Sequence, residues 1–131
     1  MTPAETAPTR RVLVVDDNED AADSLATLLD VMGYEVRTAY DGPEAIKAAD
    51  EFQPAVALLD IGLPRLSGYD IARHVRQKRG AEVLLVAITG WGQEEDRRRA
   101  REAGFDHHFT KPADFDQLIK LIDRELKDRA A

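Results

Sequence analysis

Three short apolar runs constrain the fold of this chain more than any other feature. They are 12–15 (VLVV), 55–59 (AVALL) and 83–88 (VLLVAI), and none contains a polar residue. A continuous apolar run of this length indicates a strand that is buried on both faces, and the β-branched residues of 12–15 favour a strand further. Such strands occur where helices cover both sides of a parallel sheet.

Helix-forming segments separate these runs. After the first run, Ala22, Leu25, Leu29 and Met32 repeat at helical spacing, and Gly33 supplies a stop. Three further helices are expected: from Gly42-Pro43 to before Pro54, from Ser67 or Gly68, and over 93–103. A last helix is expected from its cap Asp114, with an apolar stripe formed by Phe115, Leu118, Ile119, Ile122 and Leu126. Shorter strands are expected over 34–39 and 107–110.

Strand and helix therefore alternate five times along the chain. With right-handed crossovers, this order predicts an α/β fold: a doubly wound, five-stranded parallel sheet with five helices. A chain of 131 residues makes one domain. We expect a flexible N-terminal lead-in over 1–10, the domain over 11–128, and a C-terminal tail over 129–131.

Composition narrows the classes of function. The net charge of −7 disfavours direct nucleic-acid binding, which needs a basic surface, and favours a protein or a cation as partner. Cysteine is absent, so disulfides, thiolate metal sites and cysteine nucleophiles are excluded. The longest apolar run is too short for membrane insertion, and the first residues lack the apolar core of a secretory signal. By elimination, we expect a cytoplasmic protein.

Polar side chains follow the strands at the point where each strand ends. Asp16 and Asp17 follow the first strand, Asp60 the third, Thr89 the fourth and Lys111 the fifth. In a doubly wound sheet, ligands bind beyond the carboxyl ends of the strands, so these groups should converge. Any one of the acids alone would be read as a helix cap or turn residue; the group together predicts a site.

The chemistry of this group indicates phosphoryl transfer. Clustered carboxylates without His or Cys ligands favour a hard cation, and Mg²⁺ suits carboxylates, waters and a phosphate. Lys111 supplies a compact positive charge for a phosphate oxygen, and Thr89 a hydroxyl donor. A carboxylate can be the nucleophile, which forms an aspartyl-phosphate. Asp60 is the best candidate, because it ends the central apolar strand.

Four motifs together resemble the receiver domain of two-component response regulators. They are VLVVDDN at 12–18, LLDIGLPRLSGYD at 58–70, AITG at 87–90 and FTKP at 109–112. The resemblance implies the flavodoxin-like receiver fold, with phosphorylation of Asp60. It implies direct Mg²⁺ binding by Asp17, Asp60 and the Gly62 carbonyl, with Asp16 acting through water.

The resemblance also implies partners and a switch. The donor would be a phosphohistidine on a histidine kinase or histidine phosphotransfer protein. The receiver would catalyse only its own phosphorylation and dephosphorylation, so it is not expected to be an enzyme toward other substrates. On phosphorylation, the Thr89 hydroxyl would move inward toward the phosphoryl group, and Lys111 would form an ion pair with that group. A side chain on the fifth strand would then turn inward, and the surface of the fourth helix, fifth strand and fifth helix would signal to a downstream protein. The position that usually carries Tyr or Phe in this switch is His108 here, a smaller and titratable side chain.

Two features near this switch have more than one interpretation. The charged helix over 93–103 is either a solvated face, with Glu94–Arg98 and Glu95–Arg99 pairs, or a docking helix anchored by Ala100 and Ala103. Trp91 either shields the phosphoryl group or fills space.

Other classes of protein fit less well. Mg²⁺-dependent phosphatases with an aspartate nucleophile resemble one another in placing a second Asp, which acts as the acid, two residues after the nucleophile. This chain has Gly62 at that position, which argues against such a phosphatase. A nucleotide- or flavin-binding module would carry a glycine-rich loop where this chain has DDNED. His107 and His108 are adjacent on a strand and point to opposite faces, so they are not expected to share a metal. His74 is interpreted as a lone surface histidine.

Within the family, two histories stay open. The chain has no residues after 128 that would form an output domain, so we expect either a single-domain regulator or the receiver of a hybrid histidine kinase. The stretch GFDHHFTKP resembles receivers attached to hybrid kinases.

Overall fold

The computed structural model describes residues 10–63, 66–90 and 94–130, with the side chains of the last helix described as far as 128. In this part of the chain, strands and helices alternate as the sequence predicts. The strands are β1 (Arg11–Val15), β2 (Glu35–Ala39), β3 (Val56–Asp60), β4 (Leu84–Thr89) and β5 (His107–Thr110); the helices are α1 (Glu19–Val31), α2 (Gly42–Phe52), α3 (Gly68–Arg79), α4 (Glu94–Ala103) and α5 (Phe115–Ala130), with a 3-10 turn over Gly80–Glu82.

The five strands form one parallel sheet in the order β2-β1-β3-β4-β5. β1 lies between β2 and β3, so the chain crosses to one edge for β2 and then returns to build the other half. This reversal places a switch point between β1 and β3. Leu59 is in register with Val15, so the residues that follow these two strands emerge side by side.

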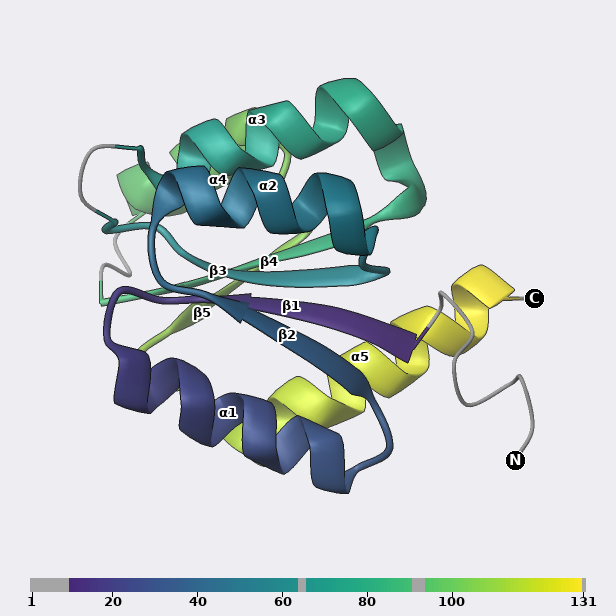
Figure 1. Cartoon of the computed structure of the whole chain (residues 1–131). Coiled ribbons are helices and arrows are strands. Elements are labelled where there is room, and N and C mark those ends of the chain that lie inside the picture. Colours follow the sequence, from purple (N-terminus) through teal and green to yellow (C-terminus); the bar gives the residue numbers. More distant parts are fainter. Residues whose placement is uncertain (1–9, 64–65, 91–93, 131) are drawn as a thin grey trace.

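Helices cover both faces of the sheet, with α2, α3 and α4 on one side and α1 and α5 on the other (Figure 1). Alternate strand residues supply the two cores: Leu13 and Leu59 face α2 to α4, whereas Val14 and Leu58 face α1 and α5. All five residues of β3 are buried, as expected of the central strand. The doubly wound α/β fold predicted from the sequence is confirmed.

Side-chain caps explain where the helices begin. The Asn18 side chain accepts a hydrogen bond from the Ala21 N–H, and Asp41 accepts one from Glu44. Ser67 and Asp70 form a reciprocal capping box at the start of α3. The predicted cap of the last helix is confirmed, because Asp114 Oδ1 accepts from the Gln117 N–H at 3.2 Å.

One detail of the predicted first helix is wrong. Ala22 and Leu29 are buried as expected, but Met32 is 47% exposed. The helix ends at Val31 and Met32 is its C-cap, so its side chain no longer follows the buried stripe. Within the described residues, no helix is both long and apolar enough to cross a membrane.

Candidate functional site

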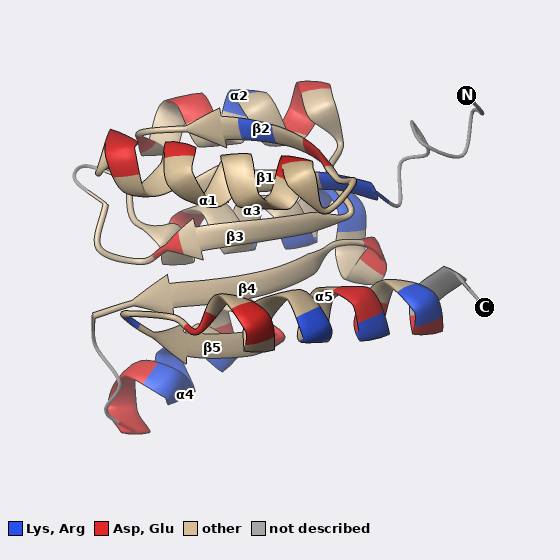
Figure 2. Cartoon of the chain, turned by 90° about the horizontal axis from the view of Figure 1, so that it is seen from below, with Lys and Arg blue, Asp and Glu red and all other residues tan. Residues whose placement is uncertain are grey.

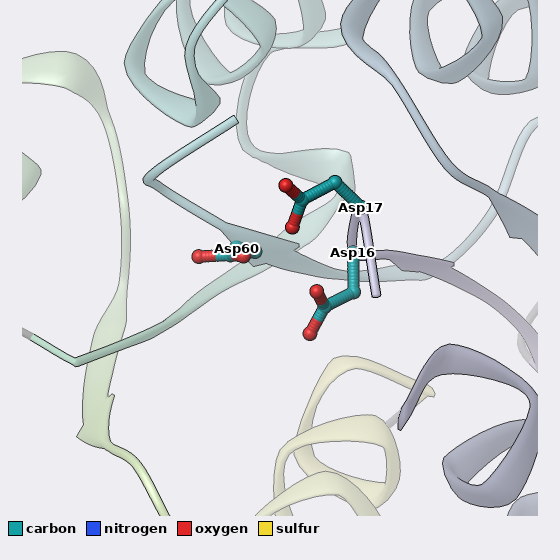
Figure 3. A group of neighbouring side chains, drawn as sticks. All are labelled: Asp16, Asp17 and Asp60. Carbon is teal, nitrogen blue, oxygen red and sulfur yellow. The ribbon is translucent and has the colours of Figure 1, made fainter. Parts of the chain in front are cut away.

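The switch point between β1 and β3 holds the acidic side chains that the sequence singled out. Asp60 is the last residue of β3, and Asp16 and Asp17 directly follow β1. Oxygen atoms of the three carboxylates all lie within 4.8 Å of one another. The three side chains approach one another from two neighbouring strand ends (Figure 3). The predicted convergence of these acids is therefore present.

The three acids differ in their exposure to solvent. Asp16 and Asp60 are buried, whereas Asp17 is exposed. Asp16 Oδ1 accepts a hydrogen bond from the Asn18 N–H at 2.9 Å, which orients its carboxylate. Asp60 Oδ1 accepts one from the Gly62 N–H at 3.1 Å. Each buried acid is thus held by a backbone donor two residues further along the chain, and each has a second oxygen for other contacts.

Lys111 joins the two buried acids. Its Nζ donates to Asp16 Oδ2 at 3.1 Å and to Asp60 Oδ2 at 3.3 Å. The lysine follows β5, and its backbone N–H donates to the Thr89 carbonyl at 2.7 Å, which ties it to the end of β4. A residue 51 positions from Asp60 in the sequence therefore reaches the site because β4 and β5 are adjacent and parallel.

The charges of this cluster oppose one another. Burial raises the pKa of Asp60 and the Asp16 carboxylate adds to this effect, although the Gly62 N–H and Lys111 act in the other direction. Burial disfavours the Lys111 ammonium, but hydrogen bonds and attraction from Asp16 and Asp60 raise its pKa on balance. The raised pKa of Lys111 and the raised pKa of Asp60 are consistent with each other. Lys111 is stabilised as a cation by two carboxylates, whereas Asp60 shares that cation with Asp16 and is repelled by the Asp16 carboxylate. The cluster therefore has excess negative charge that a further cation would neutralise.

Thr89 ends β4 beside this cluster. Its side chain is buried, with 1% of the residue exposed, and its backbone carbonyl accepts from Lys111. This position agrees with the strand-end placement predicted from the sequence. Trp91, for which a shielding role was considered, lies outside the described residues.

The backbone near Asp60 contains a contact that the sequence interpretation missed. The Gly68 N–H, at the start of α3, donates to the Ile61 carbonyl at 3.2 Å. A Cβ atom at Gly68 would lie 2.7 Å from the Asp60 carbonyl oxygen and 2.8 Å from the Ile61 Cα. The absence of a side chain at Gly68 thus lets α3 pack directly against the backbone that carries Asp60. The sequence pointed to Gly68 only as a helix start.

The three histidines lie on α3 and β5 and do not belong to the group of side chains that could hold a metal ion. His107 Nε2 lies 3.1 Å from Glu125 Oε1 of α5. His74, interpreted as a lone surface histidine, is partly exposed on α3, and its Nε2 lies 3.1 Å from Asp50 Oδ1 of α2, a partner that the sequence did not reveal. His108 is on β5 and is partly buried, at the predicted switch position.

The charged helix α4 also differs in detail from the predicted ion pairs. Arg98 pairs with Glu95 at 2.5 Å and with Glu102 at 3.6 Å. Arg99 lies over the ring of Tyr69, 4.7 Å from its centroid. Ala100 and Ala103 are buried, as predicted, and anchor the helix.

The donor set fits a hard divalent cation. Among the described residues, the only grouping of three or more His, Cys, Asp or Glu side chains with metal-binding spacing is Asp16, Asp17 and Asp60. All of its ligand atoms are carboxylate oxygens, which Mg²⁺ and Ca²⁺ prefer. Because Asp17 is exposed, one side of the cluster faces solvent.

Comparison with known proteins agrees with this arrangement. Residues 12–123 match the family described as the response regulator receiver domain. A curated relative, the DNA-binding dual master transcriptional regulator RpaA of Synechocystis sp., is 30% identical over 113 residues. That match covers 86% of this chain but 47% of the relative, so the chain spans about half the length of this protein.

Solved structures have the same fold. A CheY-like receiver domain protein from Methanospirillum hungatei is 27% identical with a TM-score of 0.86, and the match covers 92% of this chain and 96% of that one. A response regulator from Burkholderia pseudomallei, solved with a phosphorylated aspartic acid, calcium ion and citrate, is 26% identical with a TM-score of 0.81, covering 91% and 69% of the two chains.

The strand order, the acids at the switch point and the family match over 12–123 all indicate one assignment. This chain belongs to the response regulator receiver domain family of two-component systems.

Proposed function

We propose that this receiver domain is the phosphoacceptor of a two-component phosphorelay and that Asp60 accepts the phosphoryl group. The observation that carries the proposal is the geometry at Asp60: one of its oxygens contacts Lys111 at 3.3 Å, and its carboxylate belongs to the three-acid cluster. The related Burkholderia protein, which carries a phosphorylated aspartic acid and a calcium ion, supports the same chemistry here.

The residues that would hold Mg²⁺ are Asp17, Asp60 and the Gly62 carbonyl, with Asp16 acting through a water molecule. The spacing of the three carboxylates and their all-oxygen character fit such an ion. When bound, Mg²⁺ supplies positive charge that stabilises the phosphoryl oxygens.

In the proposed reaction, a carboxylate oxygen of Asp60 attacks the phosphorus of a phosphohistidine. The new O–P bond forms as the P–N bond breaks, and the imidazole of the donor leaves. Lys111 contacts Asp60 Oδ2, which supports a role for its ammonium group in pairing with an oxygen of the transferred group. Water later attacks the phosphorus, the O–P bond to Asp60 breaks, and inorganic phosphate leaves, which returns the carboxylate. The domain thus assists only its own phosphorylation and dephosphorylation.

The proposed donor is a histidine kinase or a histidine phosphotransfer protein, and the proposed compartment is the cytoplasm. The proposed output passes through Thr89 and His108 to the surface formed by α4, β5 and α5, where a downstream protein binds. Thr89 and His108 lie on the adjacent strands β4 and β5, which supports a short path between them. We propose neither direct nucleic-acid binding nor membrane insertion for this domain.

The acceptor assignment is tested by incubation with Mg²⁺ and acetyl phosphate, followed by intact-mass spectrometry. We expect wild-type protein to gain one phosphoryl group and Asp60→Asn to gain none. Asp30→Asn, which neutralises an exposed acid on α1, is the matched control and should label like wild type. Equal labelling of Asp60→Asn would refute the assignment.

The metal assignment is tested separately with Asp17→Ala. Because Asp17 is the exposed member of the cluster, its removal should weaken Mg²⁺ binding with little effect on folding. Calorimetric titration should show the affinity for Mg²⁺ falling by roughly tenfold or more. An unchanged affinity would leave Asp17 without a role as a ligand.

A further inference from the structure

Uncommitted cations gather on one side of this acidic protein. Among the Lys and Arg side chains that the structure describes, six make no ion pair, cation–π contact or hydrogen bond. Five of these six lie on α4 and α5, and four of the five line hollows beside β5: Arg97, Arg101, Lys120 and Arg124. The other two of the six are Lys47 on α2 and Lys127 near the end of α5. Figure 2 shows basic segments on both of these helices, which flank β5.

These four cations border two hollows on either side of His108. One hollow, of about 230 Å³, is lined by Arg97 and Arg101 of α4 together with Ala100 and Phe105. The other, of about 370 Å³, is lined by Lys120 and Arg124 of α5 together with Phe109 and Leu121. His107 and His108 line both hollows. We call this surface the basic face, defined by Arg97, Arg101, Lys120 and Arg124 around His107 and His108.

The acids near the basic face are already engaged. Asp106 lines the first hollow, but its Oδ2 pairs with Arg76 at 2.6 Å and accepts from the Leu85 N–H at 2.8 Å. Glu125 faces His107, and Asp123 accepts a hydrogen bond from the Tyr34 hydroxyl.

The remaining acids of these helices form no ion pair with the cations of the basic face. Glu95 and Glu102 are both paired with Arg98. The acids of the two helices that make no such contact line neither hollow; these are Glu94, Asp96, Asp116 and Asp128. Glu94 and Glu95 line a further hollow with Arg98 and Arg101, but within the described residues no acid forms an ion pair with any of the four cations of the basic face.

We propose that the basic face binds an acidic segment of a partner protein. The proposal rests on the proposed function, in which α4, β5 and α5 form the output surface, and it adds the chemistry of the partner. Carboxylates of the segment would face the four cations, and its apolar side chains would enter the hollows beside Phe105 and Leu121. A nucleic acid fits less well, because the protein as a whole carries a charge of −7.

The proposal is tested with unphosphorylated protein and a labelled peptide of about 16 residues that repeats Glu-Leu-Glu-Glu. Fluorescence anisotropy should show saturable binding that weakens as the salt concentration rises from about 0.05 to 0.5 M. The double variant Arg101→Glu, Arg124→Glu should weaken binding by roughly tenfold or more, because it places like charges opposite the peptide.

The control reverses the two uncommitted cations that lie outside the basic face. Lys47→Glu, Lys127→Glu changes the net charge by the same amount and should alter the affinity by less than about twofold. Circular dichroism should show that both double variants are folded. Asp60→Asn should bind the peptide like wild type, so a failure of the acceptor assignment would leave this result unaffected.

Several outcomes would overturn the proposal. One is the lack of saturable peptide binding at low salt, and another is equal weakening by both double variants. Equal binding of a peptide with Gln in place of Glu would also exclude recognition of acidic groups. Tighter binding of a DNA duplex than of the acidic peptide would assign the basic face to nucleic acid instead.

Discussion

Replacement of Gly68 by alanine should both destabilise the domain and slow its phosphorylation. Gly68 begins α3 and packs against the backbone of Asp60 and Ile61. The added Cβ would lie 2.7 Å from the Asp60 carbonyl oxygen, whereas ordinary contacts begin at 3.4 Å. To relieve this overlap, α3 and the end of β3 must separate by about 0.7 Å.

The size of the effect follows from two opposing terms. Overpacking of this kind costs about 1–3 kcal/mol, because the neighbouring atoms belong to the backbone and cannot rotate away. Alanine is favoured over glycine in a helix by at most about 1 kcal/mol, and less in the first turn. The clash therefore dominates, and we expect a loss of about 1–2 kcal/mol in the free energy of unfolding. Because a displacement of about 1 Å can slow a reaction by about a hundredfold, labelling of Asp60 should slow by roughly tenfold.

Urea unfolding and the rate of labelling by acetyl phosphate measure these two effects. Gly90→Ala is the matched control for stability, because a Cβ at Gly90 meets no atom within 4 Å. That control should leave the urea midpoint unchanged. If Gly68→Ala is as stable as wild type and is labelled at the same rate, the close approach of α3 does not position Asp60.

Two further predictions concern charged side chains. Because the pKa of Asp60 in the folded protein is raised above its ordinary value of 3.8, the ionised carboxylate destabilises the fold at neutral pH. Without Mg²⁺, Asp60→Asn should unfold at a higher urea concentration than wild type at pH 7, and the difference should shrink as the pH falls toward 3.8; a gain that persists in acid would contradict this cause. Arg76 donates to the Gly104, Gly80 and Val83 carbonyls and to Asp106, so Arg76→Met should lower the free energy of unfolding by about 2 kcal/mol. The exposed Arg73→Met should lower it by less than about 0.5 kcal/mol, and equal losses in urea titration would exclude a special role for Arg76.

Much of the fold could be predicted from local patterns. The continuous apolar runs indicated buried parallel strands, because only helices on both faces of a sheet bury both sides of a strand. Caps such as Ser67 and Asp114 marked helix starts, because their side chains satisfy free backbone N–H groups within the same turn. These features depend on neighbours in the sequence and are therefore visible in it.

The membership of the site was also predictable, because parallel strands end at one edge of the sheet. Asp16, Asp17, Asp60 and Lys111 were assigned from their positions after apolar runs, and the structure brings them together. The pairing of His74 with Asp50 was missed, because it depends on how α2 packs against α3. Met32 was misplaced, because the end of α1 was not visible in the spacing of apolar residues.

The sequence by itself therefore determined the order of strands and helices, the family, and which side chains stand at the strand ends. Only the tertiary structure decided that Lys111 bridges Asp16 and Asp60, that Gly68 lies against the backbone of Asp60, and that Arg97, Arg101, Lys120 and Arg124 share one face. The physical reason is the same in each case. Such contacts join residues that are distant in the chain, and their distances are set by packing between elements, which local sequence patterns do not specify.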